Sequence, residues 1–178
     1  MTAPVTVVCD REYRTVDKAA WLAGAWQDEP DKAQWVDAAT DFDCLVVRNT
    51  AGGLCGYVGL PRQHPWHGKE YGDCLRGCPE DDYCCGHSPD GRVGVHGGLT
   101  FSNCCAEGRD ETVGVCHVPL PGRPHDVWWF GFDCGHSGDL LPEPHFAKYF
   151  GDGVYRDFAY VQAECVRLAA QLAMVTAP

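Results

Sequence analysis

The sequence predicts a single α+β domain over residues 1–178, with a mainly antiparallel sheet of about five strands and helices on one side. Short apolar segments separated by Gly and Pro residues predict the strands. Residues 155–174 carry apolar side chains at three- and four-residue spacings, which is typical of an amphipathic helix. With 45% hydrophobic and 22% charged residues, a chain of 178 residues can bury one sizeable core.

In the first third of the chain, residues 5–9 form an apolar run that we interpret as a strand. Residues 15–24 are expected to form a helix that begins at a threonine cap. Residues 28–40 are expected to form a second helix, because acidic residues and a proline favour a first helical turn. The apolar runs 44–48 and 54–60 then flank a glycine-containing loop, which predicts a β-hairpin.

Residues 91–101 and 126–134 are predicted to form two further strands. Alternation along the first strand places His96 between glycines and opposite an apolar face. Alternation along the second places Asp133 on the same face as Gly131. Since glycine inside a strand often marks the close approach of a ligand, we expect His96 and Asp133 to project from one face of the sheet.

These strands and the turn after them carry the candidate site. A divalent metal ion is expected at His96 and Asp133, with a further ligand from the turn. In the structural alternative, Asp133 accepts backbone N–H groups at a strand end and His136 is an exposed turn residue. His64, in the loop after the hairpin, is a candidate for acid–base work because imidazole changes charge near neutral pH. The candidate catalytic residues are His96, Asp133, His136, Asp139 and His64, and the candidate pocket residues are Gly97, Gly98 and Trp129.

The chain has twelve cysteines, and several of them are clustered with histidine. Residues 73–89 resemble a small inserted loop held by structural zinc, although the spacing is not that of a standard knuckle. A reduced, exposed loop, or a disulfide formed on oxidation, is the alternative. Two further pairs are expected at opposite ends of a hairpin whose second strand is residues 112–118, and we expect most cysteines to be thiols or zinc thiolates. The candidate zinc ligands are Cys74, Cys78, Cys84, Cys85, His87, Cys104, Cys105, Cys116 and His117.

The C-terminal part is predicted to be irregular over residues 142–153 and then helical over residues 155–174. Asp152 is the expected cap, and Glu164 is expected to face outward. The stripe expected to pack against the sheet consists of Phe158, Val161, Cys165, Leu168 and Leu172.

The net charge of −11 disfavours a nucleic-acid partner, because phosphate binding requires a basic surface. No window of the sequence reaches the apolar length of a membrane span, and the N-terminus lacks the basic and apolar regions of a signal peptide. We therefore expect a cytosolic protein that does not contact a membrane.

Several motifs occur in a fixed order along the chain. They are Trp26-x-x-Glu29-Pro30-Asp31-Lys32-x-x-Trp35, Cys55-Gly56-Tyr57-Val58-Gly59, His64-Pro65, Val95-His96-Gly97-Gly98-Leu99-Thr100-Phe101, Trp128-Trp129-Phe130-Gly131-Phe132-Asp133-Cys134 and Tyr155-Arg156-Asp157. Together they resemble an uncharacterised family of small accessory proteins encoded by bacteriophages, particularly those of actinobacteria. The resemblance spans residues 21–172 and implies a phage origin and a setting in the cytoplasm of an infected bacterial host. It implies no reaction.

Two functions from different classes are compatible with these residues. The first is a small metal-dependent hydrolase with a His/Asp site, in which the ion activates a bound water. The second is a non-catalytic module, stabilised by structural zinc, that binds a host bacterial protein or sequesters a small molecule or nucleotide. A metal ion bound at the His/Asp site would favour the hydrolase, whereas metal bound only at the cysteines would favour the non-catalytic module.

Overall fold

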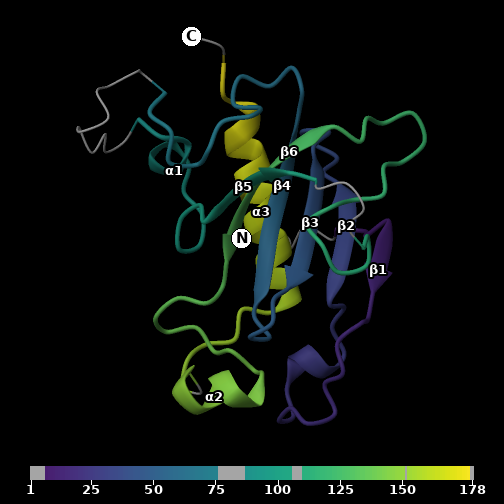
Figure 1. Cartoon of the computed structure of the whole chain (residues 1–178), viewed down its shortest axis with the longest axis vertical. Helices are drawn as coiled ribbons and strands as arrows, with labels where there is room; N and C mark the ends of the chain where they lie inside the picture. The colour runs from purple at the N-terminus through teal and green to yellow at the C-terminus, as the bar shows by residue number, and fades with distance from the viewer. Residues whose placement is uncertain (1–6, 76–86, 106–109, 151, 177–178) are drawn as a thin grey trace, which may run out of the picture.

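The computed structural model describes residues 7–75, 87–105, 110–150 and 152–176. These residues form one antiparallel sheet of six strands in the order β1-β2-β3-β4-β6-β5 (Figure 1). The α+β class with a mainly antiparallel sheet is therefore confirmed, with six strands in place of about five. The strands are β1 (Arg11–Tyr13), β2 (Lys32–Val36), β3 (Asp43–Arg48), β4 (Leu54–Pro61), β5 (Phe101–Cys104) and β6 (Val127–Asp133). The helices are α1 (Pro89–Arg92), α2 (Pro144–Phe150) and α3 (Phe158–Ala173), with a 3₁₀ turn at Ala25–Gln27.

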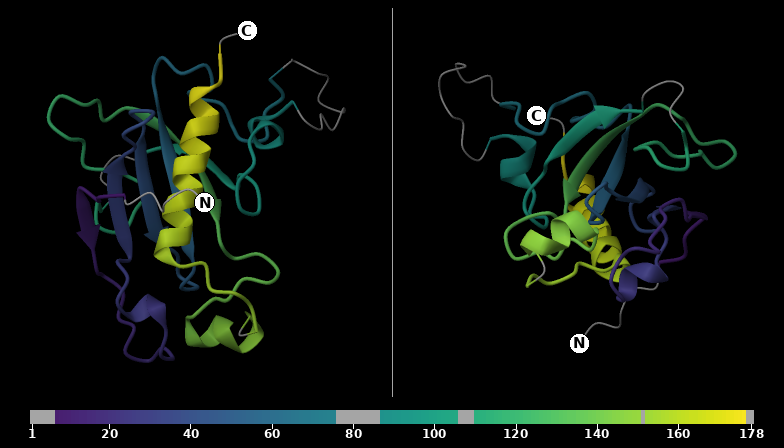
Figure 2. Two further views of the ribbon diagram at one scale, coloured as in Figure 1. Left: turned by 180° about the vertical axis from the view of Figure 1, so that it is seen from behind. Right: turned by 60° about the horizontal axis from the view of Figure 1, so that its bottom comes forward.

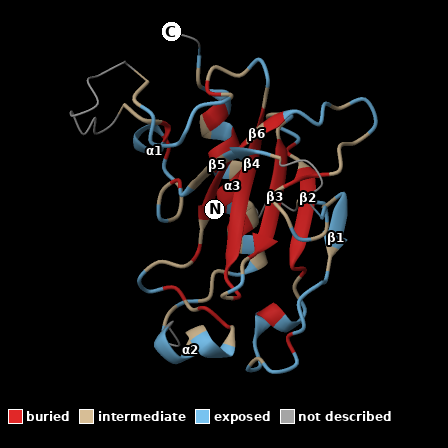
Figure 3. Ribbon diagram, in the orientation of Figure 1, coloured by how far each residue is buried: buried red, intermediate tan, exposed pale blue. Residues whose placement is uncertain are grey.

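Helix α3 lies across one face of the sheet, behind it in Figure 1 and in front of it in the left view of Figure 2. Val161, Cys165, Leu168 and Leu172 are 0% exposed and pack in one cluster with sheet residues that include Phe130. Burying one such aliphatic side chain contributes about 1.5–3 kcal/mol. Figure 3 shows this burial along the central strands, whereas the edge strand β1 is mostly exposed.

The opposite face of the sheet carries a second, smaller core that includes Tyr57 and Trp129. Residues 110–126 lie over it and are held by polar side chains from β2. Lys32 Nζ donates to the carbonyl oxygens of Glu111 and Cys116, and the Gln34 amide donates to Val118 O and accepts from Val118 N at 2.8 and 2.9 Å. An irregular segment thus covers this face where a helix covers the other.

A buried ion network closes the end of the sheet where α3 begins. Arg48 Nε lies 2.8 Å from Asp31 Oδ1, and Arg48 Nη2 lies 3.1 Å from Glu29 Oε2. Glu29 Oε1 accepts the backbone N–H of Phe158, the first residue of α3, at 2.8 Å. Tyr155 Oη donates to Glu29 Oε2 at 2.5 Å. This network joins the N-terminal segment, the β3–β4 hairpin and the start of α3.

The two helices predicted before the hairpin are wrong. Residues 15–24 form turns, and residues 32–36 of the expected second helix form strand β2, paired antiparallel with β3. Asp31, expected in a first helical turn, instead accepts hydrogen bonds from Thr15 N and Val16 N and contacts Lys18 Nζ at 2.6 Å. Because the Asp31 carboxylate bonds to residues 15–18, it does not bond to the N–H groups of the residues that follow it, as a helix cap would. The predicted strand over residues 5–9 is also absent from the described residues 7–9.

The predicted strand over residues 91–101 is a short helix, a loop and only then β5. Gly97 and Gly98 have φ angles of +67° and +88°, far from the negative φ of regular strands. Side chains satisfy part of the backbone of this loop: the Gln171 amide oxygen accepts from Gly94 N at 2.7 Å, and Asp90 Oδ1 accepts from Leu99 N at 2.6 Å. Pairing with β6 begins at Thr100, whose N–H donates to Gly131 O at 2.9 Å. Residues 112–118 are likewise not a strand.

The C-terminal helix and the β6 strand are confirmed, with shifted bounds. Asp157, not Asp152, caps α3, because its side chain accepts the Tyr160 N–H. Glu164 was expected to face outward but is only 6% exposed. The interval expected to be irregular contains α2.

We expect Leu168→Ala to lower the free energy of unfolding by about 2–5 kcal/mol, because it leaves a cavity in the main core. Leu22→Ala is the matched control: Leu22 is 72% exposed, so the same substitution should cost less than about 0.5 kcal/mol. Urea unfolding measures both. Equal effects of the two variants would show that α3 does not pack as described.

We expect Asp31→Asn to cost about 3–5 kcal/mol at pH 7, because it removes the counter-charge of the buried Lys18 and one of the two counter-charges of the buried Arg48. Burial alone would raise the pKa of Asp31, but the bonds from Lys18, Val16, Arg48 and Thr15 lower it below its usual value. The carboxylate therefore stabilises the fold above about pH 4, its unfolded pKa, and this contribution is lost as pH falls through the folded pKa.

Urea unfolding at pH 7 and at pH 3 tests this prediction. The difference in free energy of unfolding between the wild type and Asp31→Asn should be smaller at pH 3 than at pH 7. Glu12→Gln is the control, since Glu12 pairs with Arg14 at an exposed site and should contribute less than about 1 kcal/mol. A gap that widens at pH 3 would contradict the assigned role of Asp31.

Candidate functional site

His96, His136 and Asp139 come together beside the sheet, and each offers one ligand atom within 4.8 Å of the others. His96 lies in the loop between α1 and β5, and the other two lie in the turn after β6. His96 Nε2 is 2.7 Å from Asp139 Oδ2, and His136 Nδ1 is 3.9 Å from the same oxygen. The Asp139 side chain is 2% exposed, whereas the His136 side chain is 34% exposed. The cluster is therefore anchored by a buried carboxylate and is accessible to solvent through one imidazole.

Three donors hold the Asp139 carboxylate. Arg156 Nε donates to Oδ1 at 2.9 Å, while His96 Nε2 and the backbone N–H of His136 donate to Oδ2 at 2.7 and 3.1 Å. Burial by itself would raise the pKa of Asp139, but the bonds from His96, Arg156 and His136 lower it below its usual value. Asp139 is thus an ionised, oriented carboxylate at neutral pH.

Helix α3 fixes the position of His96. Its Tyr160 hydroxyl lies 3.0 Å from His96 Nδ1, and its Glu164 Oε2 accepts the backbone N–H of His96 at 2.9 Å. Because an ionised Asp139 can only accept, Nε2 of His96 carries a hydrogen, and in the matching tautomer Nδ1 can accept from the Tyr160 hydroxyl. Tyr160 and Glu164 are four residues apart and therefore face the same direction from α3.

The His136 ring lies directly on the backbone of Gly97. A Cβ atom added at Gly97 would be 2.1 Å from Cε1 of that ring, so only glycine allows this approach. His136 Nδ1 is buried and has no hydrogen-bond partner among the described residues, although Asp133 Oδ1 is 3.8 Å away. An unpartnered buried nitrogen facing a carboxylate is an available metal ligand.

Asp133 does not belong to this three-ligand set. Its Oδ2 accepts from Thr100 Oγ1 and its Oδ1 accepts from Gly135 N, both at 2.9 Å. The prediction that His96 and Asp133 project from one face of the sheet is wrong, since His96 is on a loop held by α3. Asp133 is a neighbour of His136, with its side chain 34% exposed.

The predicted pocket residues do not form a pocket around His96. The space over Gly97 is filled by His136, and a Cβ at Gly98 would lie 2.9 Å from Asp90 Oδ1. Trp129 is 0% exposed in the second core, on the sheet face away from α3. Glycine is required at both positions because of close packing and positive φ, and not because a ligand pocket lies beside them.

His64 has a structural role and lies outside the cluster. Trp66 N donates to its Nδ1 at 3.0 Å, so its Nε2 carries the hydrogen and donates to Leu172 O near the end of α3, also at 3.0 Å. Burial lowers the pKa of His64, which keeps the ring neutral at pH 7. Both nitrogens are occupied, which contradicts the predicted role in acid–base catalysis.

The cysteines predicted to bind zinc are only partly described. Cys105 and Cys116 form a disulfide, and since a disulfide sulfur is not a thiolate, this form does not offer them as zinc ligands, contrary to the prediction. Cys104 is an exposed thiol, and His117 is 1% exposed, packed on Trp129 and stacked with His125. Cys78, Cys84 and Cys85 lie outside the described residues, so zinc at these and at Cys74 and His87 stays a prediction.

Sequence reasoning missed the residues that support the cluster: Tyr160, Glu164 and Arg156. The available signal was on α3, where Tyr160 and Glu164 are polar residues next to the apolar stripe. Arg156 precedes the helix and stacks its guanidinium over the Tyr160 ring at 5.0 Å.

We expect Gly97→Ala to destabilise the fold by clearly more than Gly68→Ala. Both glycines have positive φ, +67° and +79°, so each variant incurs the cost of about 1–2 kcal/mol for a left-handed residue. Only at Gly97 would the new methyl group also displace a ring, because nothing lies within 4 Å of a Cβ at Gly68. Urea unfolding compares the two variants, and equal losses would rule out the His136–Gly97 contact.

Comparisons with protein-family models, with curated proteins and with solved structures found no match for this chain. Among the described helices, none combines the length and the apolar character needed to cross a membrane. The resemblance to phage accessory proteins stays a prediction.

Proposed function

We propose that this chain is a small metal-dependent hydrolase whose divalent ion is held by His96, His136 and Asp139. The observation that supports it most directly is the buried Nδ1 of His136, which has no hydrogen-bond partner in the described part of the chain and lies 3.9 Å from an ionised carboxylate that also contacts His96. Two imidazoles and one carboxylate with an open position are a ligand set of catalytic zinc and of non-haem iron.

The spacing of the donor atoms suits a single ion. Ligands at about 2.0–2.1 Å in a tetrahedral zinc site lie about 3.3 Å from one another. The two measured separations, 2.7 Å from His96 Nε2 to Asp139 Oδ2 and 3.9 Å from His136 Nδ1 to that oxygen, lie on either side of this value. The third separation, between the two histidine nitrogens, is within 4.8 Å, so the rings would have to move towards a common centre for all three atoms to coordinate one ion.

Tyr160 allows His96 to change partners. Coordination through Nε2 requires the ring hydrogen to move to Nδ1, and the Tyr160 hydroxyl, 3.0 Å away, can then accept where it previously donated. Metal-bound histidines are usually oriented in this way through their second nitrogen.

A divalent ion at this site would lower the pKa of a bound water towards neutrality and so supply a nucleophile. Asp133 is the carboxylate best placed to take up its proton, since Asp133 Oδ1 lies 3.8 Å from His136 Nδ1 and its side chain is partly exposed. On the resemblance to phage accessory proteins, the setting that we propose is the cytoplasm of an infected bacterium.

Metal binding provides the test. Purified protein should bind one Zn²⁺ or Co²⁺ in calorimetry, and His96→Ala or His136→Ala should weaken binding at least about hundredfold. His145→Ala is the matched control, because His145 is an exposed histidine outside the cluster. The Co²⁺ absorption spectrum separates imidazole and carboxylate ligands from thiolates.

Hydrolysis is then measured on a panel of nitrophenyl esters and phosphodiesters with Zn²⁺ added. Turnover that requires the ion and is lost in His136→Ala supports the proposal. Metal binding unchanged in His96→Ala and His136→Ala contradicts the site, while normal metal binding with no turnover on any substrate contradicts the hydrolase.

A further inference from the structure

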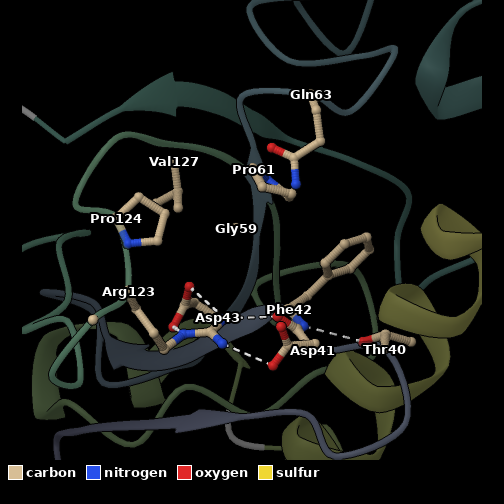
Figure 4. A pocket seen from close by; sticks show the side chains of 11 residues that line it. Thr40, Asp41, Phe42, Asp43, Gly59, Pro61, Gln63, Arg123, Pro124 and Val127 are labelled. Atoms are coloured by element: carbon tan, nitrogen blue, oxygen red, sulfur yellow. Dashed lines mark hydrogen bonds and ion pairs between the residues drawn. The ribbon is translucent and has the colours of Figure 1, made fainter.

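A second candidate site lies at the far end of the sheet from the histidine cluster. A cavity of about 290 Å³ opens where β3 begins and β4 ends (Figure 4). It is distinct from the proposed metal site, because Asp133 pairs with Cys55 at the start of β4, whereas the cavity contacts Gly59 and Pro61 at the other end. The lining residues that carry the argument are Asp41, Phe42, Asp43, Arg123, Pro124 and Val127.

One end of the cavity has more negative than positive charge. Figure 4 shows Arg123 between the carboxylates of Asp41 and Asp43. Arg123 Nη1 lies 2.7 Å from Asp41 Oδ1, and Arg123 Nη2 lies 3.2 Å from Asp43 Oδ2. His117 Nε2 is 3.9 Å from Asp43 Oδ2, but burial lowers the pKa of His117, so this ring is neutral at pH 7. Two carboxylates and one guanidinium leave a net charge of about −1.

Arg123 already donates four hydrogen bonds of the five that a guanidinium can make, whereas Asp43 accepts only two from the described residues. All three nitrogens of Arg123 already donate, and Nη2 also donates to the Asp41 carbonyl at 2.6 Å. The two Asp43 bonds to Arg123 are long, at 3.3 and 3.2 Å, and the Asp43 side chain is only 9% exposed. A carboxylate accepts up to about four hydrogen bonds, so Asp43 retains capacity for a donor. The cavity therefore favours a cation over an anion.

The other walls are apolar. Phe42, Pro61, Pro124 and Val127 surround the space next to the carboxylates. Asp41 is the one described non-glycine residue with positive φ, +61°, and its backbone N–H is fixed by Asp37 O at 2.8 Å. This tight turn presents Asp41 and Asp43 at the same mouth.

We propose that this cavity binds a small organic cation, a primary amine or amidinium on a compact apolar body, with the charged group at Asp43 and the body against Phe42 and Pro124. At about 290 Å³ the cavity is at the lower end of the sizes found for ligand pockets, which limits the body to about one ring. This proposal is independent of the metal site.

Benzylamine, benzyl alcohol and benzoate are matched probes, since they share one ring and differ in charge. Calorimetry or amide chemical-shift titration of the full chain should give the order benzylamine, then benzyl alcohol, then benzoate. Asp43→Asn should lower the affinity for benzylamine at least tenfold, whereas Arg123→Gln should raise it severalfold. The two variants change the local charge in opposite directions.

Asp41→Asn is the matched control. Asparagine tolerates a left-handed backbone, and because the Asp41 side chain is 83% exposed, its charge is screened by water. It should therefore weaken benzylamine by less than Asp43→Asn does. Thermal unfolding of each variant confirms that the fold is retained.

Two results would overturn the proposal. In the first, benzoate binds most tightly of the three probes and its binding is lost in Arg123→Gln, which would make Arg123 the anchor for an anion. In the second, none of the three probes shows saturable binding at millimolar concentration in the wild type and in Arg123→Gln.

Discussion

The rest of the structure depends on the buried ion pairs that the Arg48 side chain makes. From β3 it reaches the carboxylates of Asp31 and Glu29 and the Tyr155 hydroxyl. Glu29 in turn accepts the N–H of Phe158 and so fixes where α3 begins. Removing one member of a buried ion network leaves uncompensated charge, which costs about 3–5 kcal/mol. Because α3 carries the residues that hold His96, the geometry of the histidine cluster depends on a network at the start of the same helix.

The same network explains which parts of the fold could be predicted from the sequence. The hairpin of β3 and β4 and strand β6 were predicted because they are short apolar runs bounded by turn residues. Helix α3 was predicted because its apolar side chains recur every three or four residues. Residues 28–31 have the composition of a helix start, but Glu29 and Asp31 are acidic in order to bind Arg48 and Lys18. A local pattern cannot separate these two uses of a carboxylate, so β2 was mistaken for a helix.

The site was predicted in composition but not in geometry. His136 and Asp139 are three residues apart in one turn, so their proximity is local and readable from the sequence. His96 reaches them from a loop whose backbone is held by Glu164, a contact across 68 positions that no local pattern encodes. Alternation suggested a strand through His96, yet close packing accounts for two glycines of this loop: the His136 ring lies on Gly97, and Asp90 Oδ1 lies beside Gly98. Asp133 was consequently paired with His96 in the predicted site, alongside His136 and Asp139, although its carboxylate bonds to Thr100 and Gly135.

The donors around Asp139 also determine which ions the proposed site would prefer. Arg156 occupies Oδ1, which leaves Oδ2 as a single ligand atom facing both histidines. An ion that binds Oδ2 must therefore break the hydrogen bond from His96, and bonds from the ion to the two imidazole nitrogens must offset that loss. Mg²⁺ and Ca²⁺ favour oxygen ligands and gain little from imidazole, whereas zinc and its transition-metal neighbours bind it well. If the proposed site binds an ion, its one monodentate carboxylate and two imidazoles would therefore select against the commonest cellular divalent ions.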